Sequence, residues 1–209
     1  MIGFMSGDEF RLIVLRHGET AWSAARRHTG RTDVPLTDAG QAQARAAGKL
    51  LRDLDLRNPL VLSSPRQRAL RTAELAGLTG VVVNDDLVEW DYGDYEGRTT
   101  PEIQRTSPGW TIWTGETPGG ETAEQVRKRA DHILATVVPE LDTRDVVLVG
   151  HGHFSRALIA RWAEFEVIEG RRFFLSTAAV TVMGHDHQER TVLAHNLMAP
   201  LDPQEGAAE

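Results

Sequence analysis

The chain has 209 residues, of which 41% are hydrophobic and 25% are charged, and its formal net charge is −7. This length suits one domain with a sizeable core, and the acidic balance argues against a nucleic-acid-binding surface. No apolar run approaches the ~18 residues of a transmembrane helix, and the absence of cysteine excludes disulfides and thiolate chemistry.

We interpret residues 1–209 as one domain with mobile tails at 1–10 and 200–209. We expect no membrane contact and, by default, a cytoplasmic location. The sequence leaves the oligomeric state open, a homodimer included.

The first predicted element is a short buried strand at residues 11–15, which ends abruptly in Arg16, His17 and Gly18. The elements expected after it, in chain order, are a polar loop at 21–35, a helix at 37–56 capped by Thr37, a strand at 60–62, a helix at 64–75 beginning on Ser64-Pro65, a strand at 81–83, an acidic loop at 87–97, a short helix from residue 100, a loop at 107–120, a helix at 122–138, a strand at 146–149, a helix at 154–163 and two edge strands at 177–184 and 191–196. Strands alternating with helices predict an α/β fold, a three-layer α/β/α arrangement with a mostly parallel central sheet.

Clusters of polar side chains follow four of the predicted strands. They are, in chain order, Arg16 and His17; Ser63, Ser64, Arg66 and Arg68; Asp85, Asp86 and Glu89; and His151 and His153. Because the carboxyl ends of parallel strands meet at one edge of a sheet, we expect the four clusters to gather there.

The residue types in these clusters indicate an anion-binding pocket. Arginine suits phosphate because its planar fork donates two parallel hydrogen bonds, and a helix beginning at Ser64-Pro65 would add free N–H groups. Glu89 would repel an anion unless it is protonated or placed at a leaving group. It is therefore a candidate general acid.

Three motifs carry a resemblance to a known family: Leu-Arg-His-Gly-Glu-Thr at 15–20, Ser-Ser-Pro-Arg-Gln-Arg-Ala-Leu-Arg-Thr-Ala at 63–73 and Gly-His-Gly at 150–152. They resemble the histidine phosphatase superfamily, phosphoglycerate-mutase-like branch, and the match runs in order from residue 11 to about 196. Within that branch, the segments at 28–30, 32–37 and 89–97 are similar to actinobacterial acid phosphatases and to the sedoheptulose-bisphosphatase type.

The resemblance implies a phosphoglycerate-mutase-like fold and a role for each matched residue. It implies His17 as nucleophile, Arg16 and Arg68 as phosphate-binding residues, Glu89 as proton donor and His151 as the second pocket histidine. Thr29 and Gly30 match positions that border the phosphate. The candidate substrate-binding residues are Ser23, Thr29, Gly30, Tyr92 and His153.

The function that these assignments predict is a phosphomonoesterase acting on small phosphate esters, sugar phosphates or bisphosphates among them. His17 would form a phosphohistidine, splitting hydrolysis into two steps. Arg16, Arg68 and a protonated His151 would hold the phosphate oxygens, so we expect no metal and no cofactor. The need for protons on His151 and Glu89 predicts better activity at mildly acidic pH.

Two other functions compete with this prediction. A phosphoglycerate mutase of this family carries Trp-Asn where this chain has Trp22-Ser23, and Asn where it has His153. No basic insertion is visible at 97–120, so these departures favour hydrolysis. A non-catalytic binder of phosphorylated ligands is disfavoured because it would need neither His17 nor Glu89.

Some polar and aromatic residues also have a structural interpretation. We interpret Arg66 and Arg71 as solvated or rim charges and His132 as a residue on a helix face. Asp85 and Asp86 favour a turn over a magnesium site, and His185 and His187 favour a solvated hairpin over a metal-binding pair. For four residues, the sequence leaves open whether the side chain lines a substrate pocket or packs only against the rest of the protein. These are His153, Trp90, Trp110 and Trp113.

Overall fold

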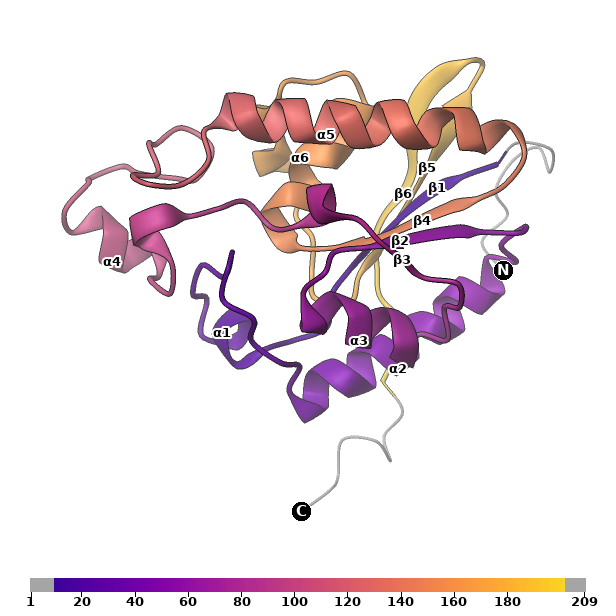
Figure 1. Ribbon diagram of the computed structural model, residues 1–209, viewed down its shortest axis with the longest axis horizontal. Helices are drawn as coiled ribbons and strands as arrows, with labels where there is room; N and C mark the ends of the chain where they lie inside the picture. Colours follow the sequence, from indigo (N-terminus) through magenta and orange to yellow (C-terminus); the bar gives the residue numbers. More distant parts are fainter. Residues whose placement is uncertain (1–9, 202–209) are drawn as a thin grey trace.

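The computed structural model describes residues 10–201, so the expectation of mobile tails falls almost entirely outside the described residues. A six-stranded sheet lies at the centre, in the order β3-β2-β4-β1-β5-β6 (Figure 1). The strands are β1 (Leu12–Arg16), β2 (Leu60–Ser63), β3 (Val82–Val83), β4 (Val146–Gly150), β5 (Val180–Asp186) and β6 (Glu189–Leu197). β1 to β4 run parallel, whereas β5 and β6 are antiparallel additions at one edge. The mostly parallel sheet predicted from the sequence is confirmed.

Helices cover both faces of this sheet. The α-helices are α1 (Ala21–Ala24), α2 (Asp38–Asp53), α3 (Gln67–Leu75), α4 (Thr100–Gln104), α5 (Ala123–Val137) and α6 (Gly152–Trp162), and the 3₁₀ helices are η1 (Asp85–Leu87), η2 (Gly93–Tyr95), η3 (Val138–Asp142) and η4 (Val167–Arg172). In Figure 1, α5 and α6 lie on one side of the strands and α2 and α3 on the other. Within the described residues, no helix is both long and apolar enough to cross a membrane.

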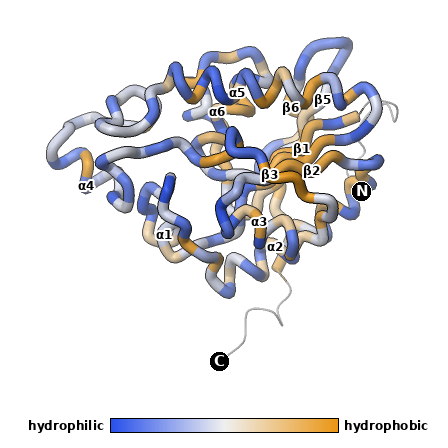
Figure 2. Tube along the Cα trace, in the orientation of Figure 1, coloured by the Kyte–Doolittle hydropathy of each residue, from blue (hydrophilic) through white to orange (hydrophobic). Residues whose placement is uncertain are grey.

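The alternating directions of the strand side chains explain the three layers. Leu12 and Val14 of β1 belong to the apolar cluster that includes residues of α5 and α6, while Ile13 and Leu15 belong to the cluster under α2 and α3. Successive strand side chains point to opposite faces, so a continuously apolar strand can bury both faces at once. Figure 2 shows the result, with hydrophobic strands at the centre and mixed helices outside.

Several local predictions differ from the structure, three of them in segments next to the site. α3 begins at Gln67 rather than at Ser64, because the backbone of Arg66 is extended and Ser64 uses its hydroxyl to bond with other groups. α6 begins at Gly152, two residues earlier than expected. The predicted loop at 21–35 contains the short helix α1, which a capping box of Thr20 and Ser23 stabilises.

Candidate active site

His17 directly follows β1, and its backbone is fixed by two neighbouring segments. Its N–H donates to the Gly150 carbonyl at 2.9 Å, and its carbonyl accepts from the N–H of Ala178 at 3.0 Å. The ring places Nδ1 2.7 Å from the Gly18 carbonyl oxygen. A carbonyl can only accept, so Nδ1 carries the hydrogen and Nε2 keeps its lone pair in the neutral ring.

The surroundings of His17 keep this ring neutral. Burial lowers the pKa of His17 well below its usual value, and the positive charges of Arg16 and Arg68 lower it further. Only 5% of the residue is exposed. A neutral imidazole with one fixed hydrogen and one free nitrogen has the form that a nucleophilic histidine needs.

Arg16, at the end of β1, is a partly buried cation that lacks part of its hydrogen bonding. Nη1 donates to the Leu175 carbonyl at 2.6 Å, whereas the buried Nε has no partner among residues 10–201. A Cβ on Gly152 would lie 3.3 Å from Arg16 Cζ, so the guanidinium packs closely on the start of α6. Leaving a charged donor unsatisfied in the interior is costly, and an anion in the adjoining cavity would remove that cost.

His151 and Arg68 form a buried pair whose contacts differ from the prediction. Arg68 Nε donates to His151 Nδ1 at 3.1 Å, and His151 Nε2 lies 2.7 Å from Ser64 Oγ. Because Nδ1 accepts, the hydrogen of the neutral ring is on Nε2. Burial and the charge of Arg68 lower the pKa of His151 well below its usual value. The prediction of a protonated His151 is therefore wrong for this arrangement.

The rest of the Arg68 guanidinium also faces protein rather than open space. Its Nη atoms donate to backbone carbonyls of the loop before α2, namely those of Thr29, Gly30 and Thr32 at 2.8–3.2 Å. Arg68 is completely buried and does not line the main cavity. In this structure Arg68 holds the loop and His151 in place through hydrogen bonds. The sequence had predicted instead that Arg68 contacts the phosphate directly.

Glu89 approaches the site from the segment between η1 and η2. Its Oε1 accepts from the N–H groups of Trp90 and Phe154 at 2.8 and 2.7 Å, and its Oε2 accepts from the N–H of His153 at 3.0 Å. Two of these donors belong to the first turn of α6, where free N–H groups favour an acidic side chain. Oε1 has two partners and Oε2 only one, so Oε2 keeps the lone pair on which a proton can reside.

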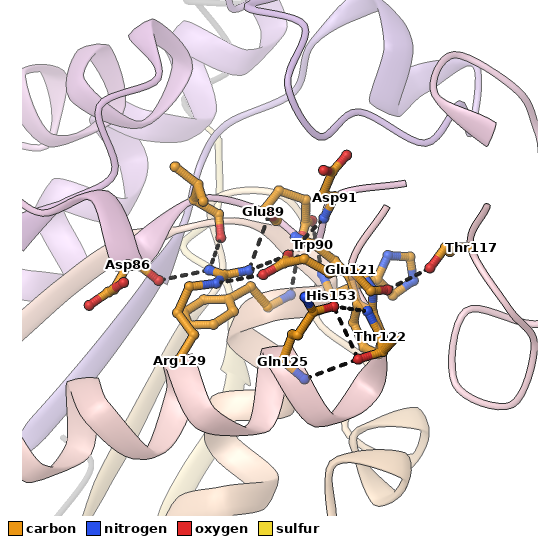
Figure 3. A network of polar contacts seen from close by, with 12 residues as sticks. Asp86, Glu89, Trp90, Asp91, Thr117, Glu121, Thr122, Gln125, Arg129 and His153 are labelled. Carbon is orange, nitrogen blue, oxygen red and sulfur yellow. Dashed lines mark hydrogen bonds and ion pairs between the residues drawn. The ribbon is translucent and has the colours of Figure 1, made fainter. Parts of the chain in front are cut away.

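A network of side chains on the far side holds the Glu89 segment (Figure 3). Arg129 of α5 donates to the carbonyls of Asp86 and Val88 at 2.7 and 2.6 Å and forms a two-pronged ion pair with Glu121. Its guanidinium carbon lies 4.0 Å from the centre of the Phe154 ring. Glu121 in turn accepts from the N–H of Asp91 at 2.9 Å. Arg129 and Glu121, which we call the Arg129 clamp, thus fix the backbone on both sides of Glu89.

A cavity of about 670 Å³ opens beside these groups. Its lining residues are Arg16, His17, Ser23, Arg26, Arg27, His28, Thr29, Glu89, Tyr92, Thr100, Gly152, His153, Arg156, Phe174, Leu175, Ser176, Thr177 and Met198. This volume lies within the usual range for small-molecule sites. Glu89 is the one carboxylate in a lining that contains four arginines, so the cavity is positive within an acidic protein.

Of the predicted binding residues, four line this cavity and one does not. Ser23, Thr29, Tyr92 and His153 are in the lining, although the Ser23 hydroxyl is already engaged in the capping box of α1. Gly30 lines a separate cavity of about 260 Å³ instead, which reaches Glu89 from the other side. Its N–H donates to both carboxylate oxygens of Glu96, so this N–H is not free for a ligand.

His153 and Tyr92 form a neutral pair at the cavity wall. The Tyr92 hydroxyl lies 2.6 Å from His153 Nδ1, and burial raises the pKa of Tyr92 well above its usual value. Burial also lowers the pKa of His153 well below its usual value. A protonated phenol can donate to Nδ1 or accept from an Nδ1–H, and in either arrangement the bond joins two uncharged groups.

Several residues of the cavity were not predicted from the sequence. The charged ones are Arg26, Arg27 and Arg156, and His28 is a further polar one. Arg156 had a signal in the sequence, because it lies four residues after Gly152 in the helix that follows β4 and so shares a helix face with it. Arg26 and Arg27 had no such signal, since loop conformation sets where they point.

Most of the structural interpretations agree with the contacts observed. Arg71 pairs with Glu74 at the surface, His132 pairs with Asp86, and His187 lies exposed in the turn between β5 and β6. Arg66 lines the smaller cavity, as a rim charge would, although its Nε is buried.

The tryptophans divide between the core and the cavity wall. Trp90 and Trp110 are core residues, 1% and 5% exposed. The Trp113 ring packs behind the cavity, with its centre 5.5 Å from that of His153.

The family model of the histidine phosphatase superfamily, branch 1, matches residues 12–198 of this chain. The chain therefore belongs to the histidine phosphatase superfamily, as the motifs at 15–20, 63–73 and 150–152 predicted.

Individual relatives carry related descriptions. An acid phosphatase of Mycobacterium tuberculosis is 49% identical over 193 residues, covering 92% of this chain and 95% of that protein. A sedoheptulose 1,7-bisphosphatase of Saccharomyces cerevisiae is 36% identical, with 73% of this chain and 67% of that protein covered. A solved structure from Mycobacterium tuberculosis superposes with a TM-score of 0.88 at 49% identity, covering 90% of this chain and 98% of the other. The fold is thus the phosphoglycerate-mutase-like fold of these neighbours, and the two relatives described above by activity are phosphatases by name.

Proposed function

We propose that this protein is a metal-independent phosphomonoesterase that hydrolyses small phosphate esters through a phosphohistidine on His17. The observation that carries the proposal is the state of His17, a neutral ring with its hydrogen on Nδ1 and a free Nε2, in a cavity whose charge comes from arginines. A nucleophile next to cationic donors suits an anionic electrophile such as a phosphate ester.

In the first step, Nε2 of His17 attacks phosphorus and the bond between phosphorus and the ester oxygen breaks. The proton on Glu89 Oε2 passes to the departing oxygen, which leaves as an alcohol. In the second step, water attacks the phosphohistidine, Glu89 takes a proton from it, and inorganic phosphate forms. Arg16, which lines the cavity, donates to the phosphate oxygens in both steps.

His151 and Arg68 support this reaction from beneath the cavity. With His151 neutral, the proton for the leaving group comes from Glu89 and not from a second protonated histidine. Four arginines supply the positive charge that phosphoryl transfer requires. We expect chelators to leave activity unchanged, and inhibition by EDTA that a divalent metal reverses would contradict this.

The direct test measures phosphate release from p-nitrophenyl phosphate by the wild type and by His17→Ala. We expect turnover in the wild type, its loss in the variant, and an acid-labile phosphoryl group on His17 after a rapid acid-free quench with labelled substrate. A wild type as inert as the variant across many phosphate esters would support a phospho-ligand binder instead.

A second assay on the same preparation distinguishes a phosphatase from a phosphoglycerate mutase. We expect phosphate release to exceed the interconversion of phosphoglycerates by a wide margin. Strong mutase turnover that depends on 2,3-bisphosphoglycerate, with negligible phosphatase activity, would reject the proposal.

A further inference from the structure

We propose that the smaller cavity behind Glu89 binds a small oxyanion, of the sulfate or phosphate kind, through Arg66. The bound anion would favour the proton-carrying form of Glu89 and so activate the enzyme toward esters whose leaving group needs a proton. The binding site follows from the geometry of the cavity, whereas the effect on turnover rests on the proposed function.

The smaller cavity is separate from the substrate cavity, and the two share one catalytic residue. Its volume is about 260 Å³, and its charged lining residues are Arg31, Arg66, Arg129, Glu89, Asp91 and Glu121. Of its whole lining, only Glu89 also lines the larger cavity. A ligand in the smaller cavity can therefore lie next to the acid without taking the place of the substrate.

Arg66 is the arginine of this cavity whose side chain has no partner. Its Nε is buried without a hydrogen-bond partner, and its guanidinium forms no ion pair within residues 10–201. Its backbone N–H is its one donor in use. Leaving a buried donor of a charged group unsatisfied is costly, and an anion in the cavity would supply the missing acceptor.

The other two arginines of the smaller cavity are already paired with carboxylates. Arg31 pairs with Asp91, and Arg129 pairs with Glu121 at 2.7 Å (Figure 3). In the proposed mechanism Glu89 carries a proton before the first step. Three arginines then face two ionised carboxylates, so the lining has one excess positive charge, which belongs to Arg66. A single small anion would balance that charge.

Anion binding and the proton on Glu89 should therefore support each other. When Glu89 is ionised, three arginines face three carboxylates and the lining has no excess positive charge. The anion thus binds more tightly to the form with neutral Glu89, and by reciprocity the bound anion favours that form. Because Glu89 gives its proton to the departing oxygen, the anion should raise the turnover of esters for which this step is slow.

Arg66 is also connected to the reacting groups through Ser64. The N–H of Arg66 donates to Ser64 Oγ at 3.3 Å, and the same Oγ lies 2.7 Å from His151 Nε2. After burial and the stronger effect of Arg68, the charge of Arg66 contributes to lowering the pKa of His151. A change of charge at Arg66 therefore reaches the catalytic centre.

The kinetic test measures kcat for butyl phosphate and p-nitrophenyl phosphate at increasing sulfate and constant ionic strength, at a pH above the optimum of the wild type. Sulfate that competes in the substrate cavity raises KM and leaves kcat unchanged, so kcat reports the second site. We expect sulfate to raise kcat for butyl phosphate by about two- to fivefold, the scale of one charge interaction at a partly exposed site. The kcat for p-nitrophenyl phosphate should not change, because p-nitrophenolate leaves without a proton.

Three variants assign this response to Arg66. Arg66→Gln should no longer respond to sulfate, and its kcat for butyl phosphate should rise by a similar factor without sulfate, since losing the positive charge also favours neutral Glu89. Arg66→Lys keeps a cation and should keep part of the response. Arg71→Gln removes a charge from the same helix, but Arg71 pairs with Glu74 at the surface, so this control should respond as the wild type does.

Equilibrium binding of radiolabelled sulfate provides a readout that does not depend on turnover. At saturation we expect one sulfate in each of the two cavities of the wild type, and the loss of one of them in Arg66→Gln. The same stoichiometry in both proteins, or a response of kcat that persists in Arg66→Gln, would overturn the inference. Continued hydrolysis of p-nitrophenyl phosphate would then leave the proposed function intact. A wild type inert toward that ester, with one sulfate still lost in Arg66→Gln, would instead remove the proposed function and keep the anion site.

Discussion

The two halves of the candidate active site are held in place by different means. His17 and His151 follow the central strands β1 and β4, whose parallel pairing includes Arg16 opposite Gly150. Their backbones are therefore fixed by the sheet. Glu89 lies on a segment with little regular structure, and side-chain contacts of the Arg129 clamp hold that segment. The nucleophile thus depends on the sheet, whereas the acid depends on a few polar contacts that substitutions can weaken selectively.

Glu89→Gln should distinguish the contribution of the acid from that of the nucleophile most clearly, because its effect should depend on the leaving group. A departing alkoxide needs a proton, whereas p-nitrophenolate does not. We expect kcat/KM for an alkyl phosphate to fall by about 100- to 10,000-fold, and that for p-nitrophenyl phosphate to fall far less. Steady-state kinetics on both esters measure this difference, and equal losses on the two would argue against Glu89 as general acid.

Arg16→Gln tests the sheet-bound half, where the effect should be the same for every leaving group. Removing a preorganised donor to the phosphate oxygens typically lowers turnover by about 100- to 1000-fold. We expect such a loss with both alkyl and p-nitrophenyl phosphates. Arg105→Gln, at an exposed position beyond α4, is the control for net charge. A loss confined to alkyl phosphates would place Arg16 with the acid instead.

Arg129→Lys should weaken the clamp while keeping its charge. Lysine lacks the planar guanidinium and cannot donate to two carbonyls and a carboxylate at once. Glu89 would therefore shift relative to the leaving group. We expect a loss of about tenfold in kcat for alkyl phosphates, with a smaller change in KM and little change for p-nitrophenyl phosphate.

A double variant distinguishes a positioning role of Arg129 from a purely structural role. In the double variant with Glu89→Gln, Arg129→Lys should add little further loss, because the group it positions is already gone. Arg127→Lys, on the same helix but paired with Glu124 and Asp131 at the surface, is the matched control. Additive losses in the double variant would show that Arg129 acts independently of Glu89.

The smallest effect concerns the stability of the protein at low pH. Burial lowers the pKa of His28 to about 4, so the unfolded chain binds a proton near pH 6.5 and the folded chain only near pH 4. Stability rises with pH where the unfolded state binds more protons, so this contribution is lost as pH falls from 6.5 to 4. We expect urea unfolding to give a weaker pH dependence for His28→Gln than for the wild type over that window.

The exposed His187 provides the comparison for this measurement. His187→Gln should keep the wild-type pH dependence, since that ring lies at the surface of the turn between β5 and β6. A His28→Gln slope equal to that of the wild type would contradict the assignment of His28 as a buried neutral histidine.

Much of the fold followed from local patterns in the sequence. The apolar runs at 11–15, 60–62 and 146–149 form the buried strands, since such runs can be buried on both faces only inside a sheet. Thr37 and Thr122 cap α2 and α5 as hydroxyl N-caps do. The residue types that follow the strands also predicted an anion site, because parallel strands end at one edge.

The tertiary structure alone decided how the polar side chains are used. Arg68 was correctly placed near the site, but only the folded loop shows that carbonyls of Thr29, Gly30 and Thr32 take up its donors. Burial and the hydrogen bond from Arg68 Nε to Nδ1 keep His151 neutral, against the prediction. The Arg129 clamp became visible only once distant segments were brought together. Sequence patterns report which residues are polar or apolar along one chain, whereas hydrogen-bond partners and charge environments depend on residues far apart in that chain.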